Sequence, residues 1–177
     1  MFPTDTVYGF LADATNRKAV EKIYKIKKRP KAKPLPIFVK SLSMAKELAE
    51  INDKQAKILR KFWPGRYTFV IKRKLSKARP RPGEVGPWKV FGVDKKTIAL
   101  RIPKNAFLQK LLKKINRPLV QTSVNISSQE PLKNIEAIIE AFGKNRLAGL
   151  VIDGGNLKKA VSSRVYNITK GLLTRIR

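Results

Sequence analysis

The sequence predicts one α/β domain, with an open sheet and flanking helices. Three observations support this fold class: amphipathic helical stripes alternate with short apolar runs, 42% of the 177 residues are apolar, and no repeat or low-complexity tract interrupts the pattern. A chain of this length can bury one sizeable core. We therefore expect a single domain over residues 1–177.

Periodicity and capping residues predict the elements in order. Residues 1–14 begin apolar and then turn through the hydroxyl-rich segment Pro3 to Gly9. Asn16 is a candidate N-cap, and Ser43 another. We expect helices over 17–28, 43–51, 53–63, 107–115 and 135–142, strands over 35–39, 67–71, 97–102, 119–125 and 150–152 and near residues 165 and 172, and a long exposed basic loop over 72–87.

The charge balance is strongly basic. The chain carries 40 Lys and Arg against 12 Asp and Glu, a formal charge of +28. This excess exceeds what solubility requires and indicates polyanionic partners such as nucleic acid. Thermophilic ancestry is an alternative cause, but it enriches Lys and Glu together, whereas acidic residues are scarce here.

The chain contains neither cysteine nor histidine. Disulfides, thiolate chemistry, Ser-His-Asp arrangements and a histidine base are therefore excluded. Catalysis would have to rest on carboxylates, hydroxyls, cations and Mg²⁺, which indicates positioning and charge stabilisation, as in phosphoryl or nucleotidyl transfer. No apolar run approaches the roughly 20 residues of a membrane span and no secretory signal is present, so we expect a cytoplasmic protein without a membrane partner.

A basic stretch, Lys25 to Pro36, is a candidate anion site. Pro30 disfavours helix at Arg29, so the helix is expected to end there. In extended chain, side chains two residues apart point the same way, so Lys27 and Arg29 could converge on one phosphate, provided that the helix has ended by residue 27. A solvated basic helix end is the alternative, and these residues alone do not separate the two.

Three polar clusters fall at predicted strand ends or loops, where α/β sheets usually bind ligands: residues 4–8, 123–127 and 162–164. Ser123, Asn125 and Ser127 have the two-residue spacing that aligns side chains in extended chain. Taken singly, each cluster is equally typical of turn or cap chemistry.

Seven short motifs then occur in a characteristic order. They are Pro3-Thr4-Asp5-Thr6-Val7-Tyr8-Gly9, Lys27-x-Arg29-Pro30, Trp63-Pro64-Gly65, Arg101-Ile102-Pro103, Ser123-x-Asn125, Asp153-Gly154-Gly155 and Ser163. Over essentially its whole length the chain resembles the YrdC-type threonylcarbamoyl-AMP synthases. The resemblance implies an open twisted sheet around a large basic cavity.

The resemblance also implies a nucleotidyltransferase activity. That family condenses L-threonine, bicarbonate or CO₂, and ATP into threonylcarbamoyl-adenylate and pyrophosphate, with Mg²⁺. The adenylate serves the modification of adenosine 37 in tRNA. The implied partners are these substrates, the downstream transferase machinery and tRNA or double-stranded RNA, and the implied state is a monomer.

Site roles follow from the resemblance position by position. Lys27 and Arg29 would be the catalytic cations that hold the ATP phosphates. Further implied ATP contacts are Lys33, Thr97, Ser123, Asn125 and Arg177, or Arg175 if the alignment shifts. The implied threonine contacts are Thr6, Arg101 and Ser163, with Arg101 facing the carboxylate. No residue is assigned as a metal ligand.

The sequence departs from the family pattern in several places. Relatives usually carry a helix and a strand before the Pro3 to Gly9 motif, and longer relatives carry a further C-terminal domain, so we expect an N-terminally truncated form without that extra domain. Lys33 and Phe38 stand where Asn and His are common. Two alternatives remain: a non-catalytic RNA-binding paralogue, and a carbamoyl transferase, although such transferases have further domains.

Overall fold

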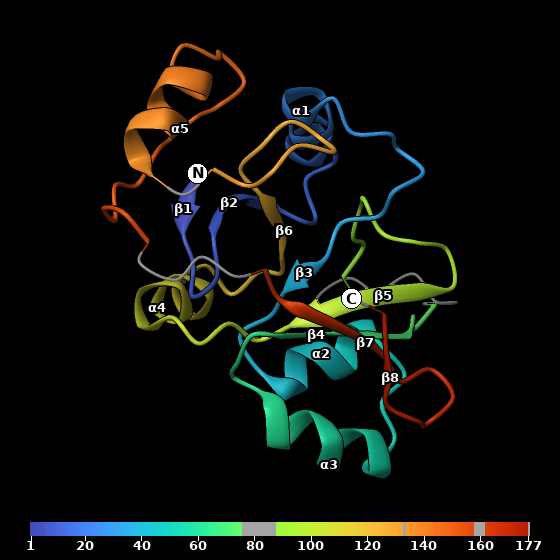
Figure 1. Cartoon of the computed structure of the whole chain (residues 1–177). Helices are drawn as coiled ribbons and strands as arrows, with labels where there is room; N and C mark the ends of the chain where they lie inside the picture. The colour runs from blue at the N-terminus through green and yellow to red at the C-terminus, as the bar shows by residue number, and fades with distance from the viewer. Residues whose placement is uncertain (76–87, 133, 158–161, 177) are drawn as a thin grey trace.

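An eight-stranded mixed sheet organises the chain (Figure 1). The computed structural model describes residues 1–75, 88–132, 134–157 and 162–176. The strand order is β1-β2-β6-β3-β5-β4-β7-β8, and the pairs β3–β5 and β4–β7 are parallel. The strands are β1 (Phe2–Pro3), β2 (Tyr8–Asp13), β3 (Ile37–Phe38), β4 (Tyr67–Lys72), β5 (Thr97–Arg101), β6 (Leu119–Ser123), β7 (Arg164–Asn167) and β8 (Thr174–Arg175). The predicted α/β class with an open sheet is confirmed.

Each described helix begins at a side chain that caps it. The helices are α1 (Arg17–Lys27), α2 (Leu42–Leu48), α3 (Asp53–Phe62), α4 (Ala106–Ile115) and α5 (Ile135–Phe142). A side-chain oxygen of the preceding residue accepts a hydrogen bond from the N–H group three residues on, which satisfies one of the unpaired donors of the first turn. The capping residues are Asn16, Ser41, Asn52, Asn105 and Asn134.

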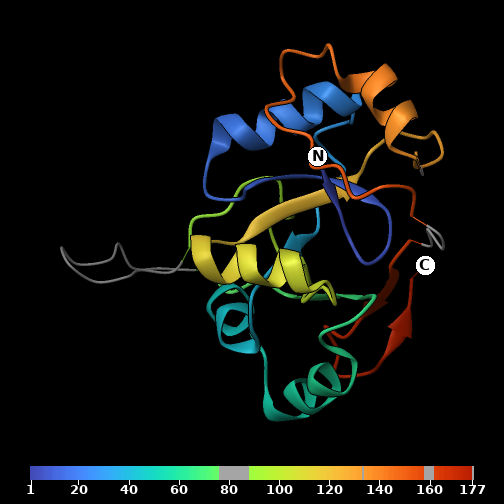
Figure 2. The ribbon, with the colours of Figure 1, turned by 90° about the vertical axis from the view of Figure 1, so that its left-hand side faces the viewer.

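The helices cover both faces of the sheet. Successive residues of a strand point to opposite faces, and Leu119 and Val120 of β6 accordingly belong to two separate apolar clusters. Leu119 packs with Leu108 and Leu112 of α4, whereas Val120 belongs to the larger core that includes α1 and α5. Figure 2 shows α1 and α5 on one side of β2 and β6, with α4 on the other.

The structure corrects three expectations about the elements. The predicted turn over residues 3–9 already includes the start of β2, which begins at Tyr8 and pairs with β6. The hydroxyl-rich sequence did not indicate this strand, because its partner lies more than 100 residues away. The predicted strand 150–152 is not formed. The Ile152 N–H donates to the Met1 carbonyl (3.0 Å) and the Leu150 carbonyl accepts from the Met1 amino group, but these bonds to one residue do not make a strand ladder. The cap of α2 is Ser41 rather than Ser43, because the Ser41 hydroxyl accepts the N–H of Met44. The predicted loop 72–87 lies mostly outside the described residues.

α1 ends in a left-handed residue. Lys28 has φ 49°, its N–H bonds to the carbonyl of Lys25, and the N–H of Arg29 bonds to the carbonyl of Tyr24, which is the Schellman pattern. The condition that the helix has ended by residue 27 is therefore not met, because Lys27 is the last helical residue. The left-handed turn at Lys28, rather than strand alternation, brings Lys27 and Arg29 to one pocket.

Lys28→Gly is expected to raise the free energy of unfolding by about 0.5–1 kcal/mol, because a Cβ at a left-handed position is unfavourable and glycine avoids it. Urea denaturation measures the change. The matched control is Lys25→Gly inside the last turn of α1, which should lower stability by about 1 kcal/mol. A destabilised Lys28→Gly variant would contradict the argument.

Candidate functional site

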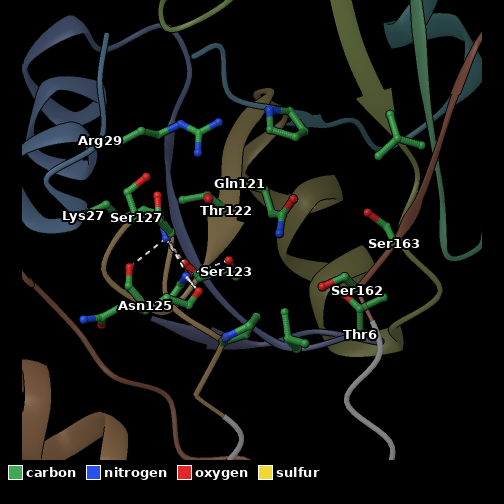
Figure 3. A pocket seen from close by; sticks show the side chains of 16 residues that line it. Thr6, Lys27, Arg29, Gln121, Thr122, Ser123, Asn125, Ser127, Ser162 and Ser163 are labelled. Carbon is green, nitrogen blue, oxygen red and sulfur yellow. Dashed lines mark hydrogen bonds between the residues drawn. The ribbon is translucent and has the colours of Figure 1, made fainter. Parts of the chain in front are cut away.

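A polar pocket of about 350 Å³ lies where the ends of α1 and β6 meet the loop before β2 and the start of β7 (Figure 3). Among its described lining residues two are cationic and none is acidic. Hydroxyl and amide side chains make up much of the remainder, so the pocket suits a polar anion. The lining residues are Thr6, Val7, Lys27, Arg29, Pro36, Gln121, Thr122, Ser123, Asn125, Ser127, Ser128, Gln129, Pro131, Ser162, Ser163 and Val165.

Lys27 is a buried cation whose hydrogens are all donated. Only 1% of the residue is exposed. Its Nζ donates to the carbonyl of Ser123 (2.6 Å) and to both the carbonyl (2.8 Å) and Oδ1 (2.7 Å) of Asn125, which accounts for the three donors of an ammonium. The Lys27 carbonyl in turn accepts the N–H of Ser127 (2.8 Å). Lys27 therefore ties the end of α1 to the turn that follows β6.

Burial shifts the titration of this ammonium. Desolvation, with a smaller contribution from the Arg29 cation, lowers the pKa of Lys27 to about 8. The three oxygen acceptors favour the charged form and oppose the shift. Lys27 is therefore charged at neutral pH and loses its proton in mildly alkaline solution.

Asn125 completes the turn. Its Oδ1 accepts from Lys27 and from the Ser123 hydroxyl (2.6 Å), and its Nδ2 donates to the carbonyls of Ile126 (3.0 Å) and Gln129 (2.6 Å). The hydrogen-bonding capacity of the amide is thus used within the protein. Its role in this structure is to shape the 123–129 turn that borders the pocket.

Arg29 contributes the second cation of the lining. Its Nε donates to the carbonyl of Lys33 (3.1 Å) and its Nη2 to the carbonyl of Pro34 (3.0 Å), so the turn orients the guanidinium. Figure 3 shows the side chain reaching over the pocket. The exposed side chain of Lys33 is not part of the lining; Lys33 supports Arg29 through its carbonyl.

A buried ion pair lies behind Thr6. Arg101 is 1% exposed and donates from Nη2 to Asp5 Oδ1 (2.6 Å), from Nη1 to Thr6 Oγ1 (3.3 Å) and from Nε to the Gly65 carbonyl (2.9 Å). Burial lowers the pKa of Arg101, whereas Asp5 favours its charged form and the Arg66 cation opposes it. Arg101 is not among the lining residues, so the structure places it as a support of Thr6.

The hydrogen bonds around Thr6 fix the direction of its hydroxyl. Thr4 donates its single hydroxyl hydrogen to the carbonyl of Val7 (2.7 Å). In the contact between Thr4 Oγ1 and Thr6 Oγ1 (2.9 Å), Thr6 must therefore be the donor. Because Arg101 also donates to Thr6 Oγ1, the Thr6 oxygen retains one lone pair. Toward a ligand, the Thr6 hydroxyl acts as an acceptor.

Of the remaining predicted site residues, one lines the pocket and the other described ones lie elsewhere. Ser163 lines the pocket, and its hydroxyl accepts from Thr68 (3.1 Å). Thr97 begins β5, at the opposite end from Arg101, and donates to Asp94 (3.2 Å) rather than lining the pocket. Arg175 is exposed in β8 and is not a lining residue, while Arg177 lies outside the described residues.

The structure thus unites six predicted residues in one pocket: Thr6, Lys27, Arg29, Ser123, Asn125 and Ser163. It adds Gln121 and Thr122 of β6, which the sequence analysis missed. The sequence does contain an indication of their role, because Gln121, Thr122 and Ser123 are consecutive polar residues in a strand that is paired on both sides, where apolar residues are usual. The large basic cavity that the resemblance implies is not confirmed by this pocket and remains a prediction.

The described residues offer neither a carboxylate cluster for a metal ion nor a helix that could span a membrane. Within the described ranges, no group of three or more His, Cys, Asp or Glu side chains is placed to hold a metal ion. No helix in the described part of the chain is long and apolar enough to cross a membrane.

Comparisons of the sequence and of the fold with known proteins point to the same family. The family model of the Sua5/YciO/YrdC domain, described as "Telomere recombination", matches residues 1–177. The threonylcarbamoyl-AMP synthase of Pyrococcus abyssi is 34% identical over 172 residues, which cover 96% of this chain and 46% of that protein. The threonylcarbamoyl-AMP synthase of Yersinia enterocolitica is 32% identical over 161 residues, 88% of this chain and 78% of that protein.

A solved structure supports the same assignment. The crystal structure of P. abyssi Sua5 complexed with L-threonine has a TM-score of 0.81 at 32% identity, covering 99% of this chain and 48% of that chain. The chain spans about half the length of the Pyrococcus protein. Since the family model covers every residue and the fold agrees with a solved member, the chain belongs to the Sua5/YciO/YrdC family.

Proposed function

We propose that the chain is an L-threonylcarbamoyladenylate synthase, which forms threonylcarbamoyl-AMP and pyrophosphate from L-threonine, bicarbonate or CO₂, and ATP. The observation that carries the proposal is the single pocket that gathers Thr6, Lys27, Arg29, Ser123, Asn125 and Ser163. The names of the related proteins favour this enzyme over a non-catalytic RNA-binding paralogue.

The chemistry needs no histidine. The neutral amine of threonine attacks the carbon of CO₂, with release of a proton to solvent, or that of bicarbonate, with loss of water, to give a carbamate. A carbamate oxygen then attacks the α-phosphate of ATP, so that pyrophosphate leaves. The chain contributes orientation and positive charge rather than a proton-transfer base. Mg²⁺ would supply further charge neutralisation and would arrive with the ATP phosphates, since the described residues offer it no cluster of carboxylates.

The pocket residues divide this work. Arg29 reaches over the pocket and is placed to hydrogen-bond the phosphates, with Lys27 adding charge from below the surface. Ser123 and Asn125 shape the nucleotide side, and Thr6 and Ser163 form the threonine side. Because the Thr6 hydroxyl acts as an acceptor, it would receive a hydrogen from the ammonium or hydroxyl of threonine, and Arg101 acts by positioning Thr6.

Several finer assignments belong to the same proposal. Lys33 and Thr97, which do not line the pocket, and Arg177 are proposed as further ATP contacts. The adenylate would pass to a transferase that modifies adenosine 37 of tRNA, with the enzyme working as a cytoplasmic monomer whose site lies within one domain over residues 1–177.

Arg29→Ala is expected to lower the rate of threonine-dependent pyrophosphate release at least tenfold, about 1.4 kcal/mol in barrier, with little change in stability. Lys27→Met should lower both the rate and the stability, because the oxygens around its Nζ lose their donor. The assay contains threonine, bicarbonate, ATP and Mg²⁺. Lys25→Ala, an exposed neighbour on α1, is the matched control, and its loss of activity would contradict the assignment.

Thr6→Val is expected to raise KM for threonine about tenfold, because valine preserves the shape but removes the acceptor oxygen. Thr6→Ser keeps that oxygen and should remain within about threefold of the original protein. Steady-state kinetics at saturating ATP measure the effect. Equal KM values for Thr6→Val and Thr6→Ser would show that the hydroxyl does not contact the substrate.

ATP affinity is expected to be nearly constant below pH 8 and to fall as the pH rises above it, because Lys27, with a pKa of about 8, loses its charge there. The phosphates of ATP are already fully ionised in this range, so the ligand charge does not change. Calorimetric titration from pH 7 to 10 measures the trend. Lys27→Met should bind ATP more weakly and without this decline, and an identical decline in Lys27→Met would assign it to another group.

A further inference from the structure

A second hollow, of about 660 Å³, is bounded by Asp5, the residue next to Thr6. It shares no residue with the pocket. The end of α3, the turn before β4 and the segment after β5 form it. Its lining residues are Asp5, Lys61, Phe62, Pro64, Gly65, Arg66, Tyr67 and Lys104.

The hollow carries an excess of positive charge. Lys61, Arg66 and Lys104 are exposed, and none of the three forms an ion pair with a described residue. The one acidic lining residue, Asp5, is already bonded to Arg101 (2.6 Å) and to the backbone N–H of Lys104 (2.9 Å). Three cations therefore face a hollow whose only carboxylate is neutralised from within the protein.

Two aromatic rings lie among these cations. The centroids of Phe62 and Tyr67 are 4.9 Å apart, and both residues are half-buried. A favourable interaction with the dipole at the end of α3 explains a cation at Lys61. It does not explain Arg66 or Lys104, which lie outside the helices, nor the aromatic pair beside them. Cations interleaved with aromatic faces are typical of sites that bind single-stranded nucleic acid.

We propose that this hollow binds a short single-stranded nucleic-acid segment, with a base stacked on Tyr67 and phosphates on Lys61, Arg66 and Lys104. The net charge of +28 favours a polyanion over a single anion. The three cations come from three segments, the end of α3, the turn before β4 and the segment after β5, and all line the same hollow. The site is distinct from the pocket and does not depend on the proposed enzymatic function.

The test measures binding of a fluorescently labelled ten-nucleotide RNA by anisotropy, without ATP or threonine, so that it is independent of the synthase assay. The triple variant Lys61→Gln, Arg66→Gln, Lys104→Gln should bind at least tenfold more weakly. The slope of log affinity against log salt should become shallower by about 2, since each lost phosphate contact on a single strand removes roughly 0.7.

The matched control is Lys110→Gln, Lys113→Gln, Lys114→Gln on α4, which removes the same charge from exposed positions elsewhere. It should change the affinity by less than about threefold. Equal losses in the two triple variants would show a general effect of net charge and would overturn the proposal. Absence of binding by the unaltered protein at low salt would overturn it as well.

A second variant separates stacking from charge. Tyr67→Leu should weaken RNA binding about tenfold, whereas Tyr67→Phe keeps the ring and should bind like the original protein. Because Tyr67 also packs against Phe62 and Tyr166, thermal unfolding confirms that both variants are folded at the assay temperature. Unchanged binding by Tyr67→Leu, or AMP competing as strongly as the unlabelled oligonucleotide, would contradict a stacked segment.

Discussion

The pocket depends on the buried ammonium of Lys27. A charge removed from water is costly unless hydrogen bonds replace its hydration, and here three oxygens of Ser123 and Asn125 do so. Those oxygens belong to the end of β6 and the turn after it, whereas Lys27 ends α1. The helix end and the strand end must therefore assemble together, because the three described acceptors of the Lys27 ammonium all lie at the end of β6 and in the turn after it. The wall of the pocket follows from that assembly.

Arg101 has the corresponding role at the other side of the pocket. Its ion pair with Asp5 is buried, and its bond to Thr6 occupies one lone pair of that hydroxyl oxygen. Both walls are thus built around a cation that the ligand does not have to order on binding. Such preorganisation is what a site that stabilises developing charge requires, since the reorientation of dipoles is completed during folding.

Local signals in the sequence predicted much of the fold, and long-range contacts account for what they missed. The apolar stripes of α4 and α5 and the start of β4 need only short-range periodicity, and the structure confirms them. The acceptors of Lys27 lie almost 100 residues away, and the same holds for Arg101 and Thr6. No spacing rule encodes such pairs, so the sequence indicated six of the residues that line the pocket without indicating that Lys27 and Arg101 support its walls through buried hydrogen bonds.

Under the proposed function, one cation of the pocket would neutralise the charge of a phosphate and the other would hydrogen-bond it. The hydrogens of Lys27 are donated within the protein, yet its charge still acts through space: at about 5 Å and an effective dielectric constant of about 20, a unit charge contributes roughly 3 kcal/mol. Arg29, on a turn and oriented by two carbonyls, is the group that can direct N–H donors at the ligand. Under the proposed function, a fixed buried cation combined with a surface cation would attract a triphosphate and still release pyrophosphate, because Arg29 would exchange hydrogen bonds with the product whereas Lys27 would not.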